Sequence, residues 1–160
     1  MPSSSPSVSV GVISDTHGLV RPEALAALRG SRYIVHAGDI GDPRVLEELA
    51  RIAPVTAVRG NNDTGAWARK LPDTDVLQVG KTRIYVIHDV KEMKLDAAAS
   101  GFQVVVAGHS HRPRNETREG VLYVNPGSAG PRRFSLPIAV GRLLVGAGTP
   151  RFELMKIAAA

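Results

Sequence analysis

The sequence predicts a mixed α/β sandwich with two β-sheets. In the first half of the chain, short apolar runs alternate with helical segments in the order strand, helix, strand, helix, strand, which indicates parallel βαβ units. In the second half, a hairpin and several later apolar runs are separated by turns, which is typical of mostly antiparallel strands. The chain shows no internal repeat and no linker. We therefore expect one domain over residues 8–157, after a short disordered lead-in over residues 1–7.

Three strands are expected in the first half, because three short runs have the apolar composition of strands buried in a parallel sheet. They cover residues 8–13, 33–36 and 55–58. Two helices separate them. Residues 21–29 start with Pro22 in the first turn and stop before Gly30, and their leucines and alanines form one apolar face. Residues 43–50 begin with a proline and follow Asp42, a good N-cap.

The second half begins with an expected hairpin. Residues 75–79 and 82–87 are strand-like, and the two residues between them start with Gly80, which suits a type II′ turn. Residues 93–100 have a helical pattern, and Gly101 would close that helix. Later strands are expected at residues 104–107, 121–124, 138–145 and 151–156.

The composition limits the classes of protein and partner. With 160 residues, of which 43% are hydrophobic, the chain is long enough for one globular domain. It has no cysteine, which excludes disulfides and thiolate metal sites and fits an expected cytoplasmic location. No apolar run approaches the ~20 residues of a membrane helix, so we expect no membrane partner. The net charge of +5 suits anionic partners, but the scattered arginines favour an ordinary solvated surface. Nucleic acid stays open as a partner.

Side chains that bind metals recur directly after the expected strands. Ligands of open α/β sheets bind beyond the carboxyl ends of the strands, which is where these side chains would lie. The seven candidates are Asp15, His17, Asp39, Asn61, His88, His109 and His111. Carboxylate, carboxamide and imidazole are ligands of hydrolytic metal centres, and seven exceed the needs of one tetrahedral zinc. The pattern predicts two metals that share a carboxylate and activate a water for attack at phosphorus.

Each of these residues alone also has a structural interpretation. Asp15 and Gly18 are ordinary turn residues, and Asp39 precedes a helix. Asn61 tolerates a left-handed backbone, and His88 could be a hydrogen-bonded core histidine. The joint pattern favours a site, because four of the five histidines fall within it.

Further residues near these motifs have two interpretations each. His36, the fifth histidine, is interpreted as a core residue or a support for a ligand rather than as a ligand. Asp63 either orients a ligand or caps a turn. Asn125 and Gly127 predict a turn near the metals, whose backbone could hydrogen-bond the imidazoles. Trp67 would form a substrate-facing lid or a dimer contact. Four arginines could bind phosphate, although we interpret most of them as solvated surface charges; they are Arg112, Arg114, Arg132 and Arg133.

The order of the motifs resembles that of the calcineurin-like metallophosphoesterases. It runs D-x-H, G-D, G-N-x-D, a histidine at a strand end, and G-H-x-H. The short length and the segments V-R-G-N-N-D and V-N-P-G-S resemble the small bacterial and archaeal phosphodiesterase branch, the YfcE/MJ0936 type. The retromer subunit Vps29 is its eukaryotic relative. The similarity spans residues 8 to about 157.

The resemblance implies a four-layer αββα sandwich, with two mixed β-sheets flanked by helices and a centre of two divalent metals. By motif position, one metal would be held by Asp15, His17, Asp39 and His111. The other would be held by Asp39, Asn61, His88 and His109, so that Asp39 bridges the two. A water or hydroxide bridging the metals would be the nucleophile, and Asp39, Asn61 and His109 would serve catalysis through it. Manganese is the first expected metal, but nickel, zinc, iron and magnesium also fit, because oxygen and nitrogen ligands do not select one metal.

Two positions depart from the family pattern. Many members have a histidine where this chain has Asn62, and that histidine is expected to contact the phosphate and help the leaving group. Its absence, which is common in the small branch, implies weaker protonation of the leaving group and favours activated phosphodiesters over alkyl monoesters. Asp89 stands where the family usually has glycine. It either reaches the site or, as we favour, caps a helix over residues 90–100.

The predicted function is therefore a metal-dependent phosphodiesterase with a small-molecule phosphodiester as substrate, assembled as a homo-oligomer. The alternative is a Vps29-like protein-interaction scaffold with weak or no catalysis. A scaffold could lose a ligand without penalty, whereas all seven ligand positions are filled in this chain. That completeness favours the enzyme.

Overall fold

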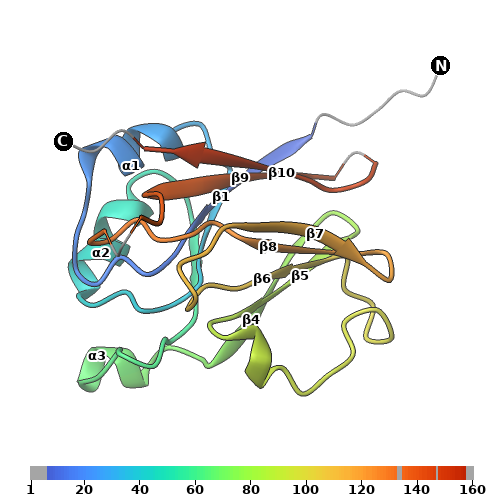
Figure 1. Ribbon diagram of the computed structural model, residues 1–160, viewed down its shortest axis with the longest axis horizontal. Coiled ribbons are helices and arrows are strands. Elements are labelled where there is room, and N and C mark those ends of the chain that lie inside the picture. Colours follow the sequence, from blue (N-terminus) through green and yellow to red (C-terminus); the bar gives the residue numbers. More distant parts are fainter. Residues whose placement is uncertain (1–6, 133–134, 147, 158–160) are drawn as a thin grey trace.

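Two stacked β-sheets of five strands each form the body of the molecule (Figure 1). The computed structural model describes residues 7–132, 135–146 and 148–157. The first sheet has the order β10-β9-β1-β2-β3. Its strands are β1 (Val8–Ile13), β2 (Tyr33–His36), β3 (Val55–Ala57), β9 (Ala139–Val145) and β10 (Arg151–Lys156). β1, β2 and β3 run parallel, as predicted, whereas β9 is antiparallel to both β1 and β10.

The second sheet has the order β4-β5-β6-β8-β7. Its strands are β4 (Thr74–Val79), β5 (Thr82–Ile87), β6 (Val104–Val106), β7 (Arg114–Arg118) and β8 (Val121–Asn125). β5, β6 and β8 are parallel, and β4 and β7 pair antiparallel at the two edges. The predicted hairpin is confirmed, because Val79 pairs with Thr82 and Gly80 between them has a φ of 59°. The predicted fold class of two mixed sheets flanked by helices is confirmed as well.

Apolar side chains fill the space between the two sheets. Val10 and Val12 of β1 share one cluster with Ile84 and Val86 of β5, and all four are fully buried. Successive side chains of a strand point to opposite faces, so Ile13 faces away from this cluster toward the helices. Because β1, β2 and β3 run parallel, and β5 and β6 do too, the loops that follow the strands of each sheet leave it at the same edge.

Two helices cover the outer face of the first sheet. They are α1 (Pro22–Leu28) and α2 (Pro43–Ala50). Leu28 and Leu49, each 1% exposed, belong to the same apolar cluster as Ile34 of β2. Asp42 caps α2 as predicted, because its carboxylate accepts a hydrogen bond of 2.8 Å from the backbone N–H of Arg44.

The helix predicted over residues 93–100 is wrong. Within the described part of the segment that covers the outer face of the second sheet, the only helix is η1 (Val90–Glu92), a single 3-10 turn. Met93, Leu95 and Ala97 all pack into one apolar cluster on that face. Residues two apart lie on nearly opposite sides of an α-helix, so a helix could not bury all three side chains, whereas an irregular chain can.

The sequence does not predict two short elements, β7 and α3 (Ala66–Arg69). β7 is an edge strand with mostly exposed polar residues, so no apolar alternation marks it. None of the helices in the described part of the chain is long and apolar enough to cross a membrane. Arg133 and all of the predicted lead-in except Ser7 lie outside the described residues.

Candidate metal centre

The loops after five strands meet at one edge of the sandwich and carry the seven predicted ligands. Asp15 and His17 follow β1, Asp39 follows β2, Asn61 follows β3, His88 follows β5, and His109 and His111 follow β6. Two groups form, and within each group the candidate ligand atoms lie within 4.8 Å of one another. One group contains Asp15, His17 and His111, and the other contains Asp39, His88 and His109.

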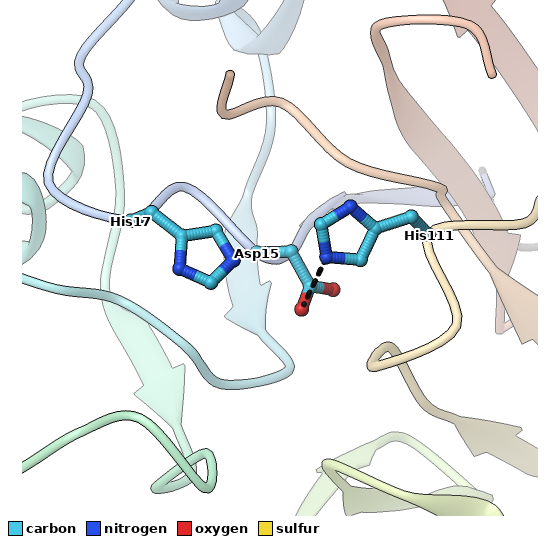
Figure 2. A group of neighbouring side chains, drawn as sticks. All are labelled: Asp15, His17 and His111. Carbon is cyan, nitrogen blue, oxygen red and sulfur yellow. Dashed lines mark ion pairs between the residues drawn. The ribbon is translucent and has the colours of Figure 1, made fainter. Parts of the chain in front are cut away.

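Asp15 lies between the rings of His17 and His111 in the first group (Figure 2). Its carboxylate is fully buried, and Oδ1 lies 3.4 Å from Nε2 of His111. The other oxygen, Oδ2, accepts hydrogen bonds from Ser14 Oγ at 2.7 Å and from the backbone N–H of His109 at 3.1 Å. The protein thus fixes Oδ2, while Oδ1 stays turned toward the imidazoles.

His88 organises the second group. Its Nε2 lies 2.9 Å from Oδ1 of Asn61 and 3.4 Å from Oδ2 of Asp39. The ring of His109 stands edge-on to the ring of His88, with their centroids 5.2 Å apart. His88 and Asp39 are buried, whereas Asn61 and His109 are exposed. A ligand arriving from solvent therefore meets Asn61 and His109 first.

The two groups adjoin at Asp39. Its Oδ2 lies 3.9 Å from Nε2 of His17 and 3.4 Å from Nε2 of His88, so this oxygen faces one imidazole of each group. Oδ1 of Asp15 lies 4.0 Å from Nε2 of His88 across the same gap. A carboxylate in this position can be shared between two cations.

Hydrogen bonds set the protonation of His88 and Asp39. Nδ1 of His88 lies 2.7 Å from the carbonyl oxygen of Ala37, so Nδ1 donates there and Nε2 faces the site. Burial lowers the pKa of His88, but its bonds to Asp39 and Ala37 outweigh burial and raise that pKa above the ordinary value. Burial raises the pKa of Asp39, but the hydrogen bonds from His88 and Asn62 outweigh it and hold that pKa well below its usual range.

Several buried polar atoms of the site lack a hydrogen-bond partner within the described part of the chain. They include Asp15 Oδ1 and His17 Nε2. Each such atom costs about 1–3 kcal/mol, which a bound cation would offset. The 3.4 Å separations His111–Asp15 and His88–Asp39 also suit a shared ion, because two ligands at about 2.0–2.1 Å in a tetrahedron lie about 3.4 Å apart. The residues present therefore fit divalent cations.

The backbone of the candidate ligands is unusual. Six non-glycine residues in the described ranges have a positive φ. Five of them are the candidate ligands Asp15, His17, Asp39, His109 and His111. A left-handed backbone costs a non-glycine residue roughly 1–2 kcal/mol. Such conformations cluster at functional sites, where the surrounding structure holds them in place.

Two glycines allow the loops to approach this closely. Gly38 has a φ of 103°, and a Cβ atom there would lie 2.6 Å from Nδ1 of His88. Gly60 packs directly against the backbone and carboxylate of Asp39, where a Cβ atom would collide. The motifs H-A-G-D and R-G-N-N-D thus contain glycine for a steric reason.

His36 lies outside both ligand groups and contacts the loops that carry the candidate ligands. It is fully buried, and its Nδ1 accepts a hydrogen bond of 3.1 Å from the backbone N–H of Gly38. Nε2 therefore carries the proton and donates to Oγ1 of Thr16 at 3.0 Å, and Thr16 donates to the carbonyl oxygen of Ile40 at 2.8 Å. Burial lowers the pKa of His36 to about 4, so the ring is neutral at pH 7. Sequence reasoning missed Thr16, because nothing in its local pattern marks this tertiary contact.

Asp63 and Asn62 fix the loop after β3. The carboxylate of Asp63 is buried and accepts three backbone hydrogen bonds of 2.9–3.1 Å. The donors are Ile40, Gly41 and Gly60. Asn62 donates to Asp39 from its backbone N–H at 2.9 Å and from Nδ2 at 3.1 Å. Asp63 fits both of its interpretations, because it closes the turn that begins at Gly60 and also holds the loops that carry Asp39 and Asn61.

Asn125 steadies the loop after β6. Its Nδ2 donates to the carbonyl oxygen of Gly108 at 3.0 Å and to Ser110 Oγ at 3.2 Å. Its Oδ1 accepts a hydrogen bond of 2.8 Å from the backbone N–H of Gly127. The predicted turn is confirmed, but these contacts go to the ligand-bearing loop rather than to the imidazoles.

Asp89 both caps a helix and approaches the site. Its Oδ1 accepts a hydrogen bond of 3.1 Å from the backbone N–H of Lys91, which confirms the predicted cap, although the helix is only the short η1. Its Oδ2 lies 3.7 Å from Nε2 of His109. Asp89 therefore fits both interpretations, because it caps η1 through one oxygen and reaches the site through the other.

A cleft of about 970 Å³ opens over the second ligand group. Its walls carry charges of both signs, and Arg59 is paired with Asp73. The other charged residues of the lining are Lys91, Lys94, Asp63, Asp89 and Glu92. Trp67 does not line this cleft but packs, half-buried, against the apolar cluster beneath the helices, which does not support a lid. Arg112 and Arg114 line a neighbouring pocket, whereas Arg132 is exposed.

A family model and two curated relatives match most of the chain. The model describes the calcineurin-like phosphoesterase superfamily domain and matches residues 8–147. A probable metallophosphoesterase of Methanothermobacter thermautotrophicus is 34% identical over 140 residues, which cover 80% of this chain and 81% of the relative. Phosphodiesterase MJ0936 of Methanocaldococcus jannaschii is 24% identical over 139 residues, which cover 75% of this chain and 83% of the relative.

Solved structures share the fold at low sequence identity. An archaeal phosphodiesterase is 20% identical with a TM-score of 0.78, covering 94% of this chain and 100% of that chain. Vps29 of Entamoeba histolytica complexed with zinc is 19% identical with a TM-score of 0.72, covering 93% of this chain and 99% of that chain.

Proposed function

This chain belongs to the calcineurin-like phosphoesterase superfamily, and we propose that it is a phosphodiesterase that works with two divalent cations. The observation that carries the proposal is the meeting of two groups of oxygen and nitrogen donors with Asp39 between them. Bound cations would supply positive charge for the phosphoryl oxygens and activate the attacking water. A relative and a structural neighbour that carry the name phosphodiesterase support a diester as substrate.

The residues of the chain hold and orient the cations. Asp15, His17 and His111 would hold one cation, and Asn61, His88 and His109 would hold the other. Asp39 would be shared, because its Oδ2 faces an imidazole of each group and its low pKa keeps it ionised. Manganese is our first choice of metal, followed by nickel, zinc, iron or magnesium.

Asn62 favours diesters over alkyl monoesters. Its carboxamide donates to Asp39 and cannot protonate a leaving group at neutral pH. Esters whose leaving group departs without a proton are therefore the better substrates.

A metal add-back assay tests the function. Metal-free protein is supplied with Mn²⁺, Ni²⁺, Zn²⁺ or Mg²⁺ and assayed with bis(p-nitrophenyl) phosphate beside p-nitrophenyl phosphate. We expect turnover with Mn²⁺ and a higher kcat/KM for the diester. Protein that binds metal by calorimetry but turns over neither ester with any ion would refute the enzyme and favour the Vps29-like scaffold.

Asp39→Asn tests the shared carboxylate. We expect kcat to fall at least about 100-fold and the metal content to fall below two ions per chain, because a carboxamide is a weaker ligand and carries no charge. Asp42→Asn is the matched control, since its exposed N-cap role is performed equally well by asparagine. Unchanged metal content and turnover in Asp39→Asn would show that this carboxylate is not shared.

A further inference from the structure

A second pocket lies beside the metal centre on the outer face of the second sheet. Its volume is about 360 Å³, within the roughly 300–1,000 Å³ of small-molecule sites. It shares Asp89, Lys91 and His109 with the cleft over the second ligand group. His109 therefore borders both spaces, and a molecule bound at the second group can extend past it. We call this space the side pocket.

The wall of the side pocket formed by the sheet is apolar. Val105 and Ala107, at the end of β6, line it together with Tyr123 of β8 and Val90 of η1. Such a surface favours a group that leaves water readily and does not favour a second phosphate. The charged side chains that line the pocket include both cations and carboxylates; they are Lys91, Arg112, Arg114, Asp89 and Glu116.

Arg114 adds a flat wall to the side pocket. Its guanidinium carbon lies 5.0 Å from the ring centroid of Tyr123, over the ring face, and Nη2 lies 3.3 Å from Oε1 of Glu116. The two contacts hold the guanidinium group in place, and the side chain is only 30% exposed. A guanidinium plane held in this way is a surface on which an aromatic ring stacks.

We propose that the side pocket binds an aromatic ring carried by the ester group that stays on the phosphate, so that the enzyme acts on diesters with one nucleoside-type ester group and a second ester group that leaves without a proton. The inference rests on the phosphodiesterase function proposed above and adds the class of substrate to it. The ring packs beside Tyr123 against Val105 and Ala107, with the guanidinium of Arg114 along its edge or outer face, while the phosphoryl group lies at the metal centre on the other side of His109.

Ligand binding isolates the contribution of the ring. Thymidine 5′-monophosphate, 2-deoxyribose 5-phosphate and inorganic phosphate are titrated into the manganese-loaded protein, because the sugar phosphate has a hydroxyl group in place of the base. We expect the nucleotide to bind at least about fivefold more tightly than the sugar phosphate, as base stacking usually contributes that much or more. In metal-free protein, methyl NMR signals of Val90 and Val105 should shift with the nucleotide and not with the sugar phosphate.

Two variants and one control assign the effect to the pocket. Arg114→Gln and Tyr123→Ala should bring the ratio of the two affinities close to one. Arg118→Gln, on the same strand but outside both spaces, should leave the ratio unchanged. Arg114→Gln keeps the test decisive if Tyr123→Ala fails to fold, because Arg114 lies at the surface.

The outcomes separate this inference from the proposed function. If the protein turns over diesters but binds nucleotide and sugar phosphate with equal affinity, the inference that the side pocket binds the ring is wrong, and the proposed phosphodiesterase function still stands. A preference for the nucleotide that disappears in Arg114→Gln would support the pocket, even if no metal gave turnover. A preference that persists in both variants would place the ring elsewhere and overturn the inference.

Discussion

Asp63→Asn should destabilise the protein and weaken metal binding, although Asp63 is not a predicted ligand. The buried carboxylate accepts two hydrogen bonds at Oδ2, from Ile40 and Gly60, and one at Oδ1, from Gly41. Asparagine can keep the first two, but its NH₂ group then faces the N–H of Gly41. One charge-assisted bond of about 1.5–3 kcal/mol is lost and two others become neutral, so we expect a loss of about 3–4 kcal/mol.

Urea unfolding of the metal-free protein measures this loss without a contribution from bound ions. Calorimetric titration with Mn²⁺ measures the second effect, which we expect to be at least about a tenfold loss of affinity, because Asp63 positions the loops of Asp39 and Asn61. Asp96→Asn is the control. Its exposed carboxylate accepts one hydrogen bond, from the backbone N–H of Ala99, and asparagine caps a turn equally well. A loss below about 1 kcal/mol with unchanged Mn²⁺ affinity would refute the reasoning.

Three further predictions concern protonation and the second ligand group. The pKa of His36 falls from 6.5 unfolded to about 4 folded, so the unfolded chain takes up the proton first and stability declines as pH falls between these values. Urea unfolding should show that the free energy of unfolding of the wild type falls by up to about 3 kcal/mol over this pH range, whereas that of His36→Asn does not. The same pH dependence of this free energy in both proteins would contradict the prediction. Because the pKa of His88 is raised, a cation must displace the proton of this imidazole, and Mn²⁺ affinity should rise with pH. Calorimetric titrations at pH 6.5 in two buffers of different ionisation enthalpy should show that Mn²⁺ binding releases protons. Asp89→Ser keeps the cap of η1 but removes the carboxylate 3.7 Å from His109, and Mn²⁺ affinity should fall about tenfold; equal affinity would show that this carboxylate does not support His109.

Most elements of the fold could be predicted because their signals are local. β1 and α2 have apolar periods, prolines and caps that need no tertiary context, and their observed bounds match the predicted ones. The prediction for residues 93–100 is wrong because their composition suits a helix. In the structure, side chains at every second position, Met93, Leu95 and Ala97, pack on the second sheet, which favours an irregular chain. β7 carries no periodic signal, since its residues face solvent at a sheet edge and only pairing with β8 makes it a strand.

The candidate site also contains residues that local sequence signals predict and residues that only the tertiary structure reveals. The seven candidate ligands could be named because each follows a recognisable strand, and the structure brings them together; their role as ligands stays a prediction. Thr16, and the three-loop contacts of Asp63, could not be found, because they depend on where loops distant in sequence meet. The side pocket was missed for the same reason, since the stacking of Arg114 on Tyr123 joins two strands whose pairing the sequence does not reveal. The predicted homo-oligomer and the single domain over residues 8–157 also stay predictions.

The left-handed backbone of five candidate ligands has an evolutionary consequence. At each of these positions glycine would relieve roughly 1–2 kcal/mol of strain while removing a ligand. Mutations that damage the chemistry can therefore raise the stability of the metal-free chain, and only selection on activity opposes them. If that selection is relaxed, genetic drift erodes the ligands and leaves the sandwich intact. The same backbone that positions the candidate ligands would thus let descendants of such a protein lose the metal centre without losing stability.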